Sequence, residues 1–346
     1  MNLMISQFYQ TSKAVLEMDD RAVVLMAASG AFLFPDLKRK YPQKFVEAVD
    51  VGIMEQSMVS IAAGMSIAGM IPIIYGQSPF IIERAYEQIK VDFGYQQLGG
   101  NFVGFGASTE NAIYGATHCC PADLAVLGMI PGMEIVVPGR PDEYHTLFLE
   151  AYADNHPTYY RITRYCNSYN KPVMFGKANI VKKGCKATVL AVGPMLELAM
   201  QAFKDEDVTI LYYTTIVPFD EKTLQANLVN DRLLVMEPAY QGGMLPQIAK
   251  ALHGNMMKMD LVGYPLEFIT NAVTGGSGFI GQYFIRDYGS AYECVVPVRD
   301  TSKMLKKAGN ITYLKSDYSF HSLMQIFSGC EAVIHLAGQK NLSTQT

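Results

Sequence analysis

The sequence predicts an α/β fold made of three successive α/β units. Short apolar runs alternate along most of the chain with segments of helical spacing, an alternation typical of parallel sheets with right-handed crossovers. Half of the 346 residues are hydrophobic and 17% are charged, as in globular proteins with sizeable cores. At roughly 100–200 residues per domain, the length allows two or three domains.

The first predicted unit covers residues 1–165. Three segments have helical spacing: Glu55–Ala68, Phe80–Phe93 and Pro141–Asp154. The apolar runs between them predict strands at Ala22–Ala27, Phe45–Ala48, Ile71–Tyr75, Asn101–Gly106, Glu134–Val137 and Tyr159–Ile162. A polar, turn-rich stretch follows, and it predicts a linker at residues 166–186.

Two further units follow this linker. Residues 187–271 form the second, with strands expected at Ala187–Ala191, Val208–Tyr213, Leu233–Glu237 and Met257–Val262 and helices at Pro194–Lys204, Glu221–Leu228 and Leu245–Leu252. Residues 272–346 begin as a strand, a glycine-rich turn and a helix, which indicates a partial Rossmann unit. Its later elements are expected at Cys294–Val298, Ile311–Leu314, Phe320–Phe327 and Ala332–His335.

Charge and cysteine usage narrow the class of protein. The formal net charge is −4, so the chain lacks the basic character of a nucleic-acid-binding protein. Its six cysteines form no CxxC pair, and no histidines accompany them at zinc spacing. A reduced, cytoplasmic location is therefore expected. The N-terminus does not have the pattern of a signal peptide.

One uncharged stretch, Gln56–Ile82, needs to be weighed as a membrane span. Glycines, a proline and serines interrupt it, whereas a spanning helix requires about 20 consecutive, predominantly apolar residues. A buried helix followed by a buried strand (Ile71–Tyr75) explains the composition better, and no membrane association is expected.

Glu55 is a candidate catalytic residue. It is the one carboxylate at the start of a strongly apolar helix. Desolvation there disfavours its charged form and would raise its pKa, so that it could exchange a proton near neutral pH. The alternative is structural, because a negative charge in the first turn of a helix stabilises the helix dipole.

Five short motifs occur in order over about 270 residues. They are GIMEQ at 52–56, FIIERAYEQI at 80–89, GATH at 115–118, IPGM at 130–133 and GG at 242–243. Together they resemble the pyrimidine-binding and C-terminal domains of the transketolase family. The chain is most similar to deoxyxylulose-phosphate synthases and to free-standing transketolase C-terminal subunits.

The resemblance implies roles for individual residues. Glu55 would bind a ring nitrogen of the aminopyrimidine of thiamine diphosphate, and Phe80 and Arg84 would complete the cofactor site. His118 would reach the donor substrate, and Arg164 would bind a substrate phosphate. Each role has a structural alternative: core packing for Phe80, a structural histidine for His118, and a solvated arginine at a strand end for Arg164.

Departures from the family pattern bear on specificity and on partners. Tyr114 stands where many transketolases have aspartate, and Cys119 and Cys120 follow the histidine. These cysteines are either reactive or inert packing. No Gly-Asp-Gly motif for magnesium and diphosphate occurs. The sequence thus predicts no metal ligands here, but one chain of a split transketolase in a dimer of heterodimers, whose partner chain binds the Mg²⁺ and the phosphates.

The glycine-rich turn carries a second resemblance. Its residues Gly275, Gly278 and Gly281 have the G-x-x-G-x-x-G spacing of the NAD-dependent epimerase and dehydratase family. Arg299, after the next strand, would then favour NADP over NAD. No tyrosine follows Tyr318, so the catalytic Tyr-x-x-x-Lys is absent and a truncated fragment is expected.

Three functions follow from these patterns. The main prediction is a transketolase-like enzyme subunit that transfers a two-carbon ketol or acyl unit between sugar-type substrates. The competing hypotheses are a fragment of an NAD(P)-dependent nucleotide-sugar epimerase or dehydratase, and a non-catalytic assembly subunit.

Overall fold

The computed structural model describes residues 3–27, 34–47, 53–267, 270–274, 294–298, 311–315 and 332–335. The chain divides into two compact units. Unit 1 contains residues 1–110 and 118–267, and unit 2 contains residues 111–117 and 268–346. Unit 1 holds two sheets with their helices.

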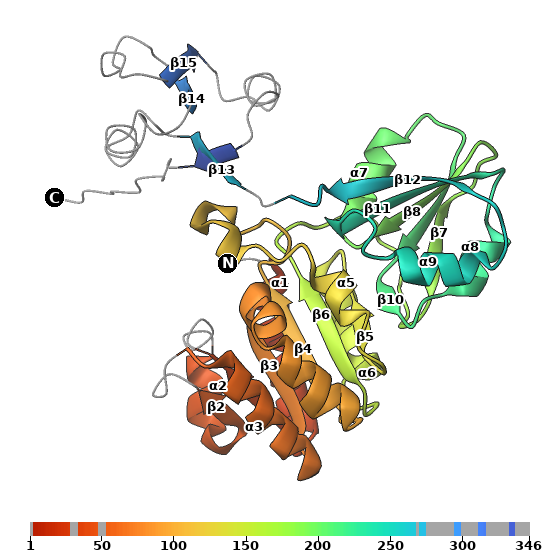
Figure 1. The fold of residues 1–346 in the computed structure, drawn as a ribbon. Helices are drawn as coiled ribbons and strands as arrows, with labels where there is room; N and C mark the ends of the chain where they lie inside the picture. Colours follow the sequence, from red (N-terminus) through yellow and green to blue (C-terminus); the bar gives the residue numbers. More distant parts are fainter. Residues whose placement is uncertain are drawn as a thin grey trace. The chain divides into compact units, whose positions relative to one another are not determined.

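A seven-stranded sheet forms the first half of unit 1 (Figure 1), in the order β10-β5-β6-β4-β3-β1-β2. All neighbours in it are parallel except β10, which runs antiparallel to β5. Its strands are β1 (Ala22–Met26), β2 (Phe45–Glu47), β3 (Ile71–Gln77), β4 (Gly100–Phe105), β5 (Glu134–Val136), β6 (Pro157–Ile162) and β10 (Thr215–Val217). The six strands expected in this half are confirmed.

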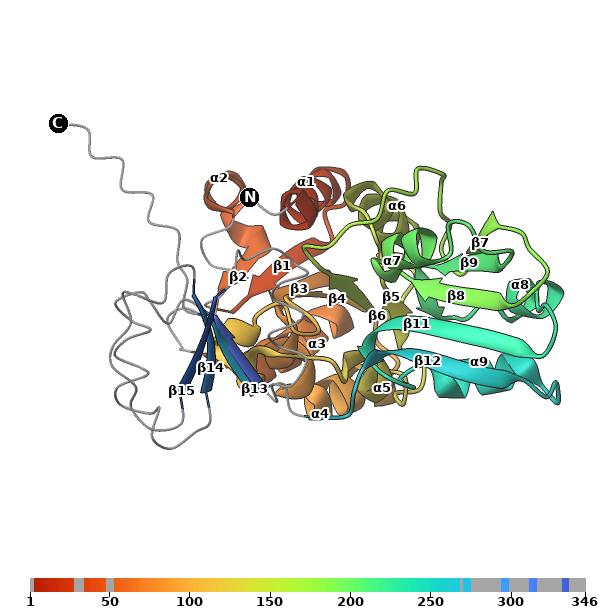
Figure 2. The same cartoon turned by 90° about the horizontal axis from the view of Figure 1, so that it is seen from above.

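Helices cover both faces of this sheet. Figure 2 shows α1 (Leu3–Met18) and α6 (Pro141–Ala151) on one face, and α3 (Glu55–Ile67) and α5 (Asp123–Leu127) on the other. The expected helix at 80–93 is also present, as π-helical turns flanking a short α-helical one. The remaining short elements of this half are α2 (Pro35–Lys40), η2 (Pro42–Lys44), η4 (Pro79–Glu83), α4 (Tyr86–Gln88) and η5 (Ile89–Tyr95). Unit 2 contains η6 (Ala112–Tyr114) and most of η7 (Ala116–His118).

The second half of unit 1 is a five-stranded sheet in the order β12-β11-β8-β9-β7. Its core strands are parallel, and β7 joins the edge antiparallel to β9. Helix α7 packs on one face, and α8 and α9 on the other. The elements are β7 (Ala178–Lys182), β8 (Thr188–Val192), α7 (Met195–Ala202), β9 (Thr209–Tyr213), α8 (Glu221–Ala226), β11 (Arg232–Tyr240), α9 (Leu245–Leu252) and β12 (Lys258–Tyr264).

The two halves share their hydrophobic cores. One cluster joins Met58 and Val59 of α3 to Leu190 of β8 and Ile248 of α9. The other joins Phe8 of α1 to residues of β3, α6, α7 and β9. Strands of both sheets contribute buried side chains to both clusters. Each core therefore continues from one sheet to the other.

Buried polar contacts also cross between the halves. The Arg161 side chain on β6 is fully buried; it donates to Asp123 at 2.7 Å and to the backbone oxygen of Pro238 in β11 at 2.6 Å. Strand β10 leaves the second half to pair with β5 in the first sheet. Unit 1 is therefore one packed body built from two α/β halves.

Several elements of unit 1 differ from the expectation. Helices α1, α2 and α5 and strand β10 were not predicted, and β7 lies inside the stretch expected to be a linker. Strand β7 lies at the edge of its sheet and is only partly buried, which explains its weak apolar signal. None of the helices in the described part of the chain combines the length and apolar character that a membrane span requires.

The described strands of unit 2 form two parallel pairs. Strand β13 (Thr270–Thr274) pairs with β16 (Ala332–His335), and β14 (Cys294–Val298) pairs with β15 (Ile311–Lys315). These strands agree with those expected for a partial Rossmann unit. Gly275, Gly278, Gly281, Arg299 and the expected helix at 320–327 lie outside the described residues.

Candidate active site

Glu55 begins helix α3, and its side chain is almost completely buried, with 2% exposed. The helix packs Met58, Val59 and Ala62 into the core beneath it. Its carboxylate stands in the first turn, where the helix dipole favours a negative charge. The burial expected for this acid is thus confirmed.

Arg84, Phe80 and His118 form a continuous set of contacts with Glu55. The Arg84 guanidinium donates to a carboxylate oxygen of Glu55 at 2.6 Å. It also lies over the Phe80 ring, 4.3 Å from the centroid, in a cation–π contact. The edge of the His118 ring meets Phe80, with the centroids 5.1 Å apart. We call these four residues the Glu55 cluster.

The sheet topology explains why Phe80 and His118, which are far apart in the sequence, meet. Phe80 follows the carboxyl end of β3, and His118 lies in the connection after the carboxyl end of the adjacent β4. Ligands of open parallel sheets bind at this edge, beyond the carboxyl ends of the strands. The cluster offers a buried acid, an aromatic face, a fixed cation and a half-buried imidazole.

Arg164 takes part in a different contact. Its side chain is about half exposed, and it pairs with Glu110 at 3.4 Å. Its guanidinium also donates to the backbone oxygen of Glu110. Burial raises the pKa of Glu110, and the hydrogen bonds and charge of Arg164 oppose that rise. Within the described residues, its contacts connect Arg164 to Glu110 rather than to the Glu55 cluster.

Cys119 and Cys120 are both buried, beside His118. Burial is the main reason that the pKa of each thiol lies above its ordinary value. A raised pKa suppresses the thiolate, which is the reactive form. Of the two interpretations of the cysteine pair, inert packing is therefore supported.

A buried polar network beside the cluster was not expected from the sequence. Tyr159 donates to Asp123 at 2.9 Å, and its hydroxyl lies 3.1 Å from that of Ser78, two residues before Phe80. Asp123 also binds Arg161. The signal in the sequence is a charged residue within the otherwise apolar strand Pro157–Ile162, because a buried arginine requires a partner. This network holds the side chain of Ser78, two residues before Phe80.

Comparison with known proteins connects this geometry to a family. The transketolase pyrimidine-binding domain matches residues 4–166, and the transketolase C-terminal domain matches residues 176–269. One of the subunits of apulose-4-phosphate transketolase from Phocaeicola vulgatus is 30% identical over 77% of this chain and 87% of its own length. The chain belongs to the transketolase family.

Other relatives agree with this assignment. A 33.6 kDa protein of the Rhodococcoides fascians fasciation locus is 35% identical over 72% of this chain and 80% of its own length. The chain spans 41% of a 1-deoxy-D-xylulose-5-phosphate synthase from Acidovorax ebreus, to which it is 32% identical. Family membership implies a transferase-type enzyme, and a pyrimidine-binding domain of this family implies thiamine diphosphate.

Solved structures share the fold of this transketolase-family chain. A structure described as a split gene transketolase, inactive beta4 tetramer, superimposes with a TM-score of 0.66 at 21% identity, covering 82% of this chain and 92% of that one. The NAD-dependent epimerase/dehydratase family matches residues 272–345, as expected for the second resemblance.

Proposed function

We propose that this chain is the C-terminal subunit of a thiamine-diphosphate-dependent, transketolase-like enzyme that acts in the cytoplasm. It would transfer a two-carbon ketol or acyl unit between sugar-type substrates. A partner chain would bind the diphosphate and Mg²⁺ in a dimer of heterodimers. The observation that carries this proposal is the Glu55 cluster, in which a buried acid, an aromatic ring and a histidine lie together at the carboxyl edge of the first sheet.

Each residue of the cluster has chemistry suited to this role. When bound, thiamine diphosphate supplies an electron sink for cleavage of a carbon–carbon bond. Glu55 would hold or donate a proton at a ring nitrogen of the pyrimidine, and its burial strengthens that hydrogen bond. Phe80 would pack against the ring. Arg84 would orient the carboxylate, and His118 would bind oxygens of the donor.

Two features support the need for a partner. The chain lacks Gly-Asp-Gly, so it offers no such motif for magnesium and diphosphate. In addition, α3 and the adjacent 89–95 helix carry exposed apolar side chains, namely Ile61, Ile67, Val91 and Tyr95. Apolar side chains gathered on a surface favour an interface with another protein. The relative from Phocaeicola vulgatus is itself named a subunit.

The relatives' names support sugar-type substrates. One is named an apulose-4-phosphate transketolase subunit and another a 6-deoxy-6-sulfo-D-fructose transketolase subunit; the latter, from a Clostridium species, is 30% identical over 60% of this chain and 66% of its own length. Both names specify unusual sugars. Many transketolases have aspartate where this chain has Tyr114. This difference also favours a donor other than the common pentose phosphates. We therefore propose a modified sugar or sugar phosphate as donor, with Arg164 as a candidate phosphate ligand.

Substitution of Glu55 tests the catalytic proposal. In the complex reconstituted with the partner, Glu55→Gln and Glu55→Ala should lower kcat by about 10²-fold or more, because proton transfer at the pyrimidine would be lost. Glu87→Gln, at an exposed position on α4, serves as the matched control and should retain activity. Wild-type kcat in both Glu55 variants would establish the alternative of a non-catalytic assembly subunit.

Cofactor binding to the isolated chain tests the need for a partner. Thiamine diphosphate with Mg²⁺ is titrated into the chain alone and into the reconstituted complex, and heat of binding is measured. Binding should be tight in the complex only, because a diphosphate requires a metal or backbone donors to offset its charge. Tight binding and turnover by the isolated chain would refute the split-enzyme proposal.

A second candidate activity, NAD(P) binding, is favoured by the epimerase-family match at residues 272–345. The glycines at 275, 278 and 281 would approach the pyrophosphate, and Arg299 would select NADP. NADP⁺ titrated into the full chain should bind, and both Gly278→Val and Arg299→Ser should weaken that binding at least tenfold. Absence of NADP⁺ binding to the wild type would eliminate this candidate.

A further inference from the structure

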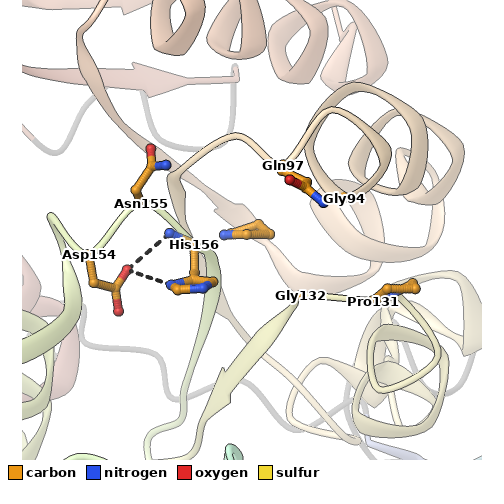
Figure 3. A pocket seen from close by; sticks show the side chains of 8 residues that line it. Gly94, Gln97, Pro131, Gly132, Asp154, Asn155 and His156 are labelled. Carbon is orange, nitrogen blue, oxygen red and sulfur yellow. Dashed lines mark hydrogen bonds and ion pairs between the residues drawn. The ribbon is translucent and has the colours of Figure 1, made fainter.

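A pocket lies at the amino ends of strands β5 and β6, in the first half of unit 1 (Figure 3). It has a volume of about 390 Å³ and lies between the end of the 89–95 helix, the turn at Pro131 and Gly132, and residues 154–157. The Glu55 cluster lies beyond the carboxyl ends of β3 and β4 of the same parallel sheet. The pocket is therefore at the opposite edge of the sheet from the candidate active site.

Three side chains with metal-binding atoms meet here, and two of them, Asp154 and His156, line the pocket. They are Glu134, the first residue of β5, and Asp154 and His156, which immediately precede β6. The Nδ1 atom of His156 lies 3.7 Å from a carboxylate oxygen of Asp154 and 3.9 Å from one of Glu134. All three ligand atoms lie within 4.8 Å of one another.

Glu134 is the buried member of this set. It is only 9% exposed, and one of its oxygens accepts a hydrogen bond from Thr158 at 2.9 Å. Its other oxygen faces the imidazole of His156 and the second carboxylate, Asp154. Among the described residues, no lysine or arginine forms an ion pair with Glu134 or Asp154. A buried carboxylate next to another carboxylate is costly unless a shared proton or a bound cation compensates the charge.

We propose that Glu134, Asp154 and His156 bind a divalent transition-metal ion, with Zn²⁺ as the best match. Imidazole nitrogen and carboxylate oxygen are both zinc ligands, at roughly 2.0–2.2 Å. The side chains of His156 and Asp154 are 54% and 29% exposed, so small rotations can bring their ligand atoms to those distances. Three protein ligands beside an open pocket leave a fourth position for water or a small anion.

The placement of the ligands defines what the metal would do. It would tie the start of β5 to the loop that leads into β6, and Asn155 in that loop has a left-handed backbone with a φ of 67°. The site would stabilise this edge of the sheet without touching the Glu55 cluster. It is thus distinct from the Mg²⁺ that the proposed function assigns to the partner chain.

Metal binding to the full chain tests this proposal directly. After removal of metals with a chelator, Zn²⁺ is titrated calorimetrically into the wild type and into His156→Ala, Asp154→Asn and Glu134→Gln. The wild type should bind one equivalent with a rise in Tm, and each variant should bind at least tenfold more weakly. His253→Asn removes an exposed histidine elsewhere and keeps a residue tolerant of its left-handed backbone, so it should bind as the wild type does.

Co²⁺ provides a spectroscopic check on the ligands. The complex should show only d–d bands, and these should disappear in His156→Ala, whose circular dichroism verifies that it is folded. A sulfur-to-metal charge-transfer band would place the ion on the exposed Cys166 or Cys185 and overturn the proposal. Equal Zn²⁺ binding by the wild type and His156→Ala, or no binding by the wild type, would overturn it as well. Neither result would affect the proposed transketolase activity.

Discussion

At the scale of single residues, the buried carboxyl group of Glu143 forms hydrogen bonds with both halves of unit 1. It lies on α6 and is 2% exposed. One carboxylate oxygen accepts from the amide of Gly139 at 2.8 Å and from the hydroxyl of Tyr212 on β9 at 2.6 Å. The other oxygen has no partner among the described residues. Burial raises the pKa of Glu143 to about 7, while those two hydrogen bonds oppose the rise.

Glu143→Gln should remove a pH dependence of stability. A carboxyl whose pKa is higher in the folded than in the unfolded protein stabilises the fold below its unfolded pKa, and this contribution is lost as the pH rises through about 7. The glutamine mimics the protonated acid at every pH. At pH 8 the variant should therefore be more stable than the wild type, by roughly 1–3 kcal/mol.

Urea unfolding at pH 5 and pH 8 measures this difference. The two proteins should have similar free energies of unfolding at pH 5 and differ at pH 8. The exposed Glu206→Gln serves as the control and should follow the wild type at both values. Parallel pH profiles of the wild type and Glu143→Gln would show that the carboxyl titrates as it does in the unfolded chain.

The sequence predicted some of these residues and not others, for a physical reason. Glu55, Phe80, Arg84 and His118 belong to motifs of a known family, and the structure brings all four together. The ion pair between Glu55 and Arg84 was not expected, because the spacing along the chain does not specify which side chains meet. No sequence pattern indicated that Glu143 is buried, because its burial comes from packing against a strand about 70 residues away.

At the scale of elements, the pair Arg161–Asp123 joins β6 to α5 and to the second half of unit 1. Both side chains are fully buried, and Arg161 also donates to the backbone oxygen of Pro238. Removing one member of a buried ion pair leaves an uncompensated charge, which is more damaging than removing both. This pair therefore fixes how β6, α5 and β11 pack.

Arg161→Met should lower the free energy of unfolding by about 3–5 kcal/mol. The double variant Arg161→Met with Asp123→Asn should lose less, because no isolated charge remains buried. Arg21→Met removes the 59% exposed partner of Asp19 and should cost less than the loss of the buried Arg161. Chemical denaturation of the four proteins gives these values. A double variant no more stable than Arg161→Met would argue against an electrostatic origin.

The strands were more predictable than the connections between them. Continuous apolar runs identified β1, β3, β4, β8 and β9, because parallel strands covered on both faces are apolar throughout. Strands β7 and β10 lie at sheet edges; β7 is only partly buried and β10 has only three residues, so neither gives a comparable run. Such a short segment also does not indicate which sheet β10 joins, because tertiary packing determines the pairing.

At the scale of the molecule, unit 1 should behave as one cooperative body, although two family domains contribute to it. Both hydrophobic clusters contain residues of both sheets. Strand β10 adds to the edge of the sheet of the other half, and the polar contacts of Arg161 and Glu143 cross the same boundary. Opening one half alone would expose apolar core and buried charges of the other, so separate opening is disfavoured.

Native-state hydrogen exchange on the full chain tests this cooperativity. The most protected amides of β4, in the first sheet, and of β9, in the second, should exchange through the same opening, with equal free energies and equal dependence on denaturant. Arg161→Met should lower both free energies by the same amount, whereas Arg21→Met should change neither appreciably. If β9 amides kept their protection while those of β4 lost it, the two halves would unfold independently and the shared cores would contribute little to stability.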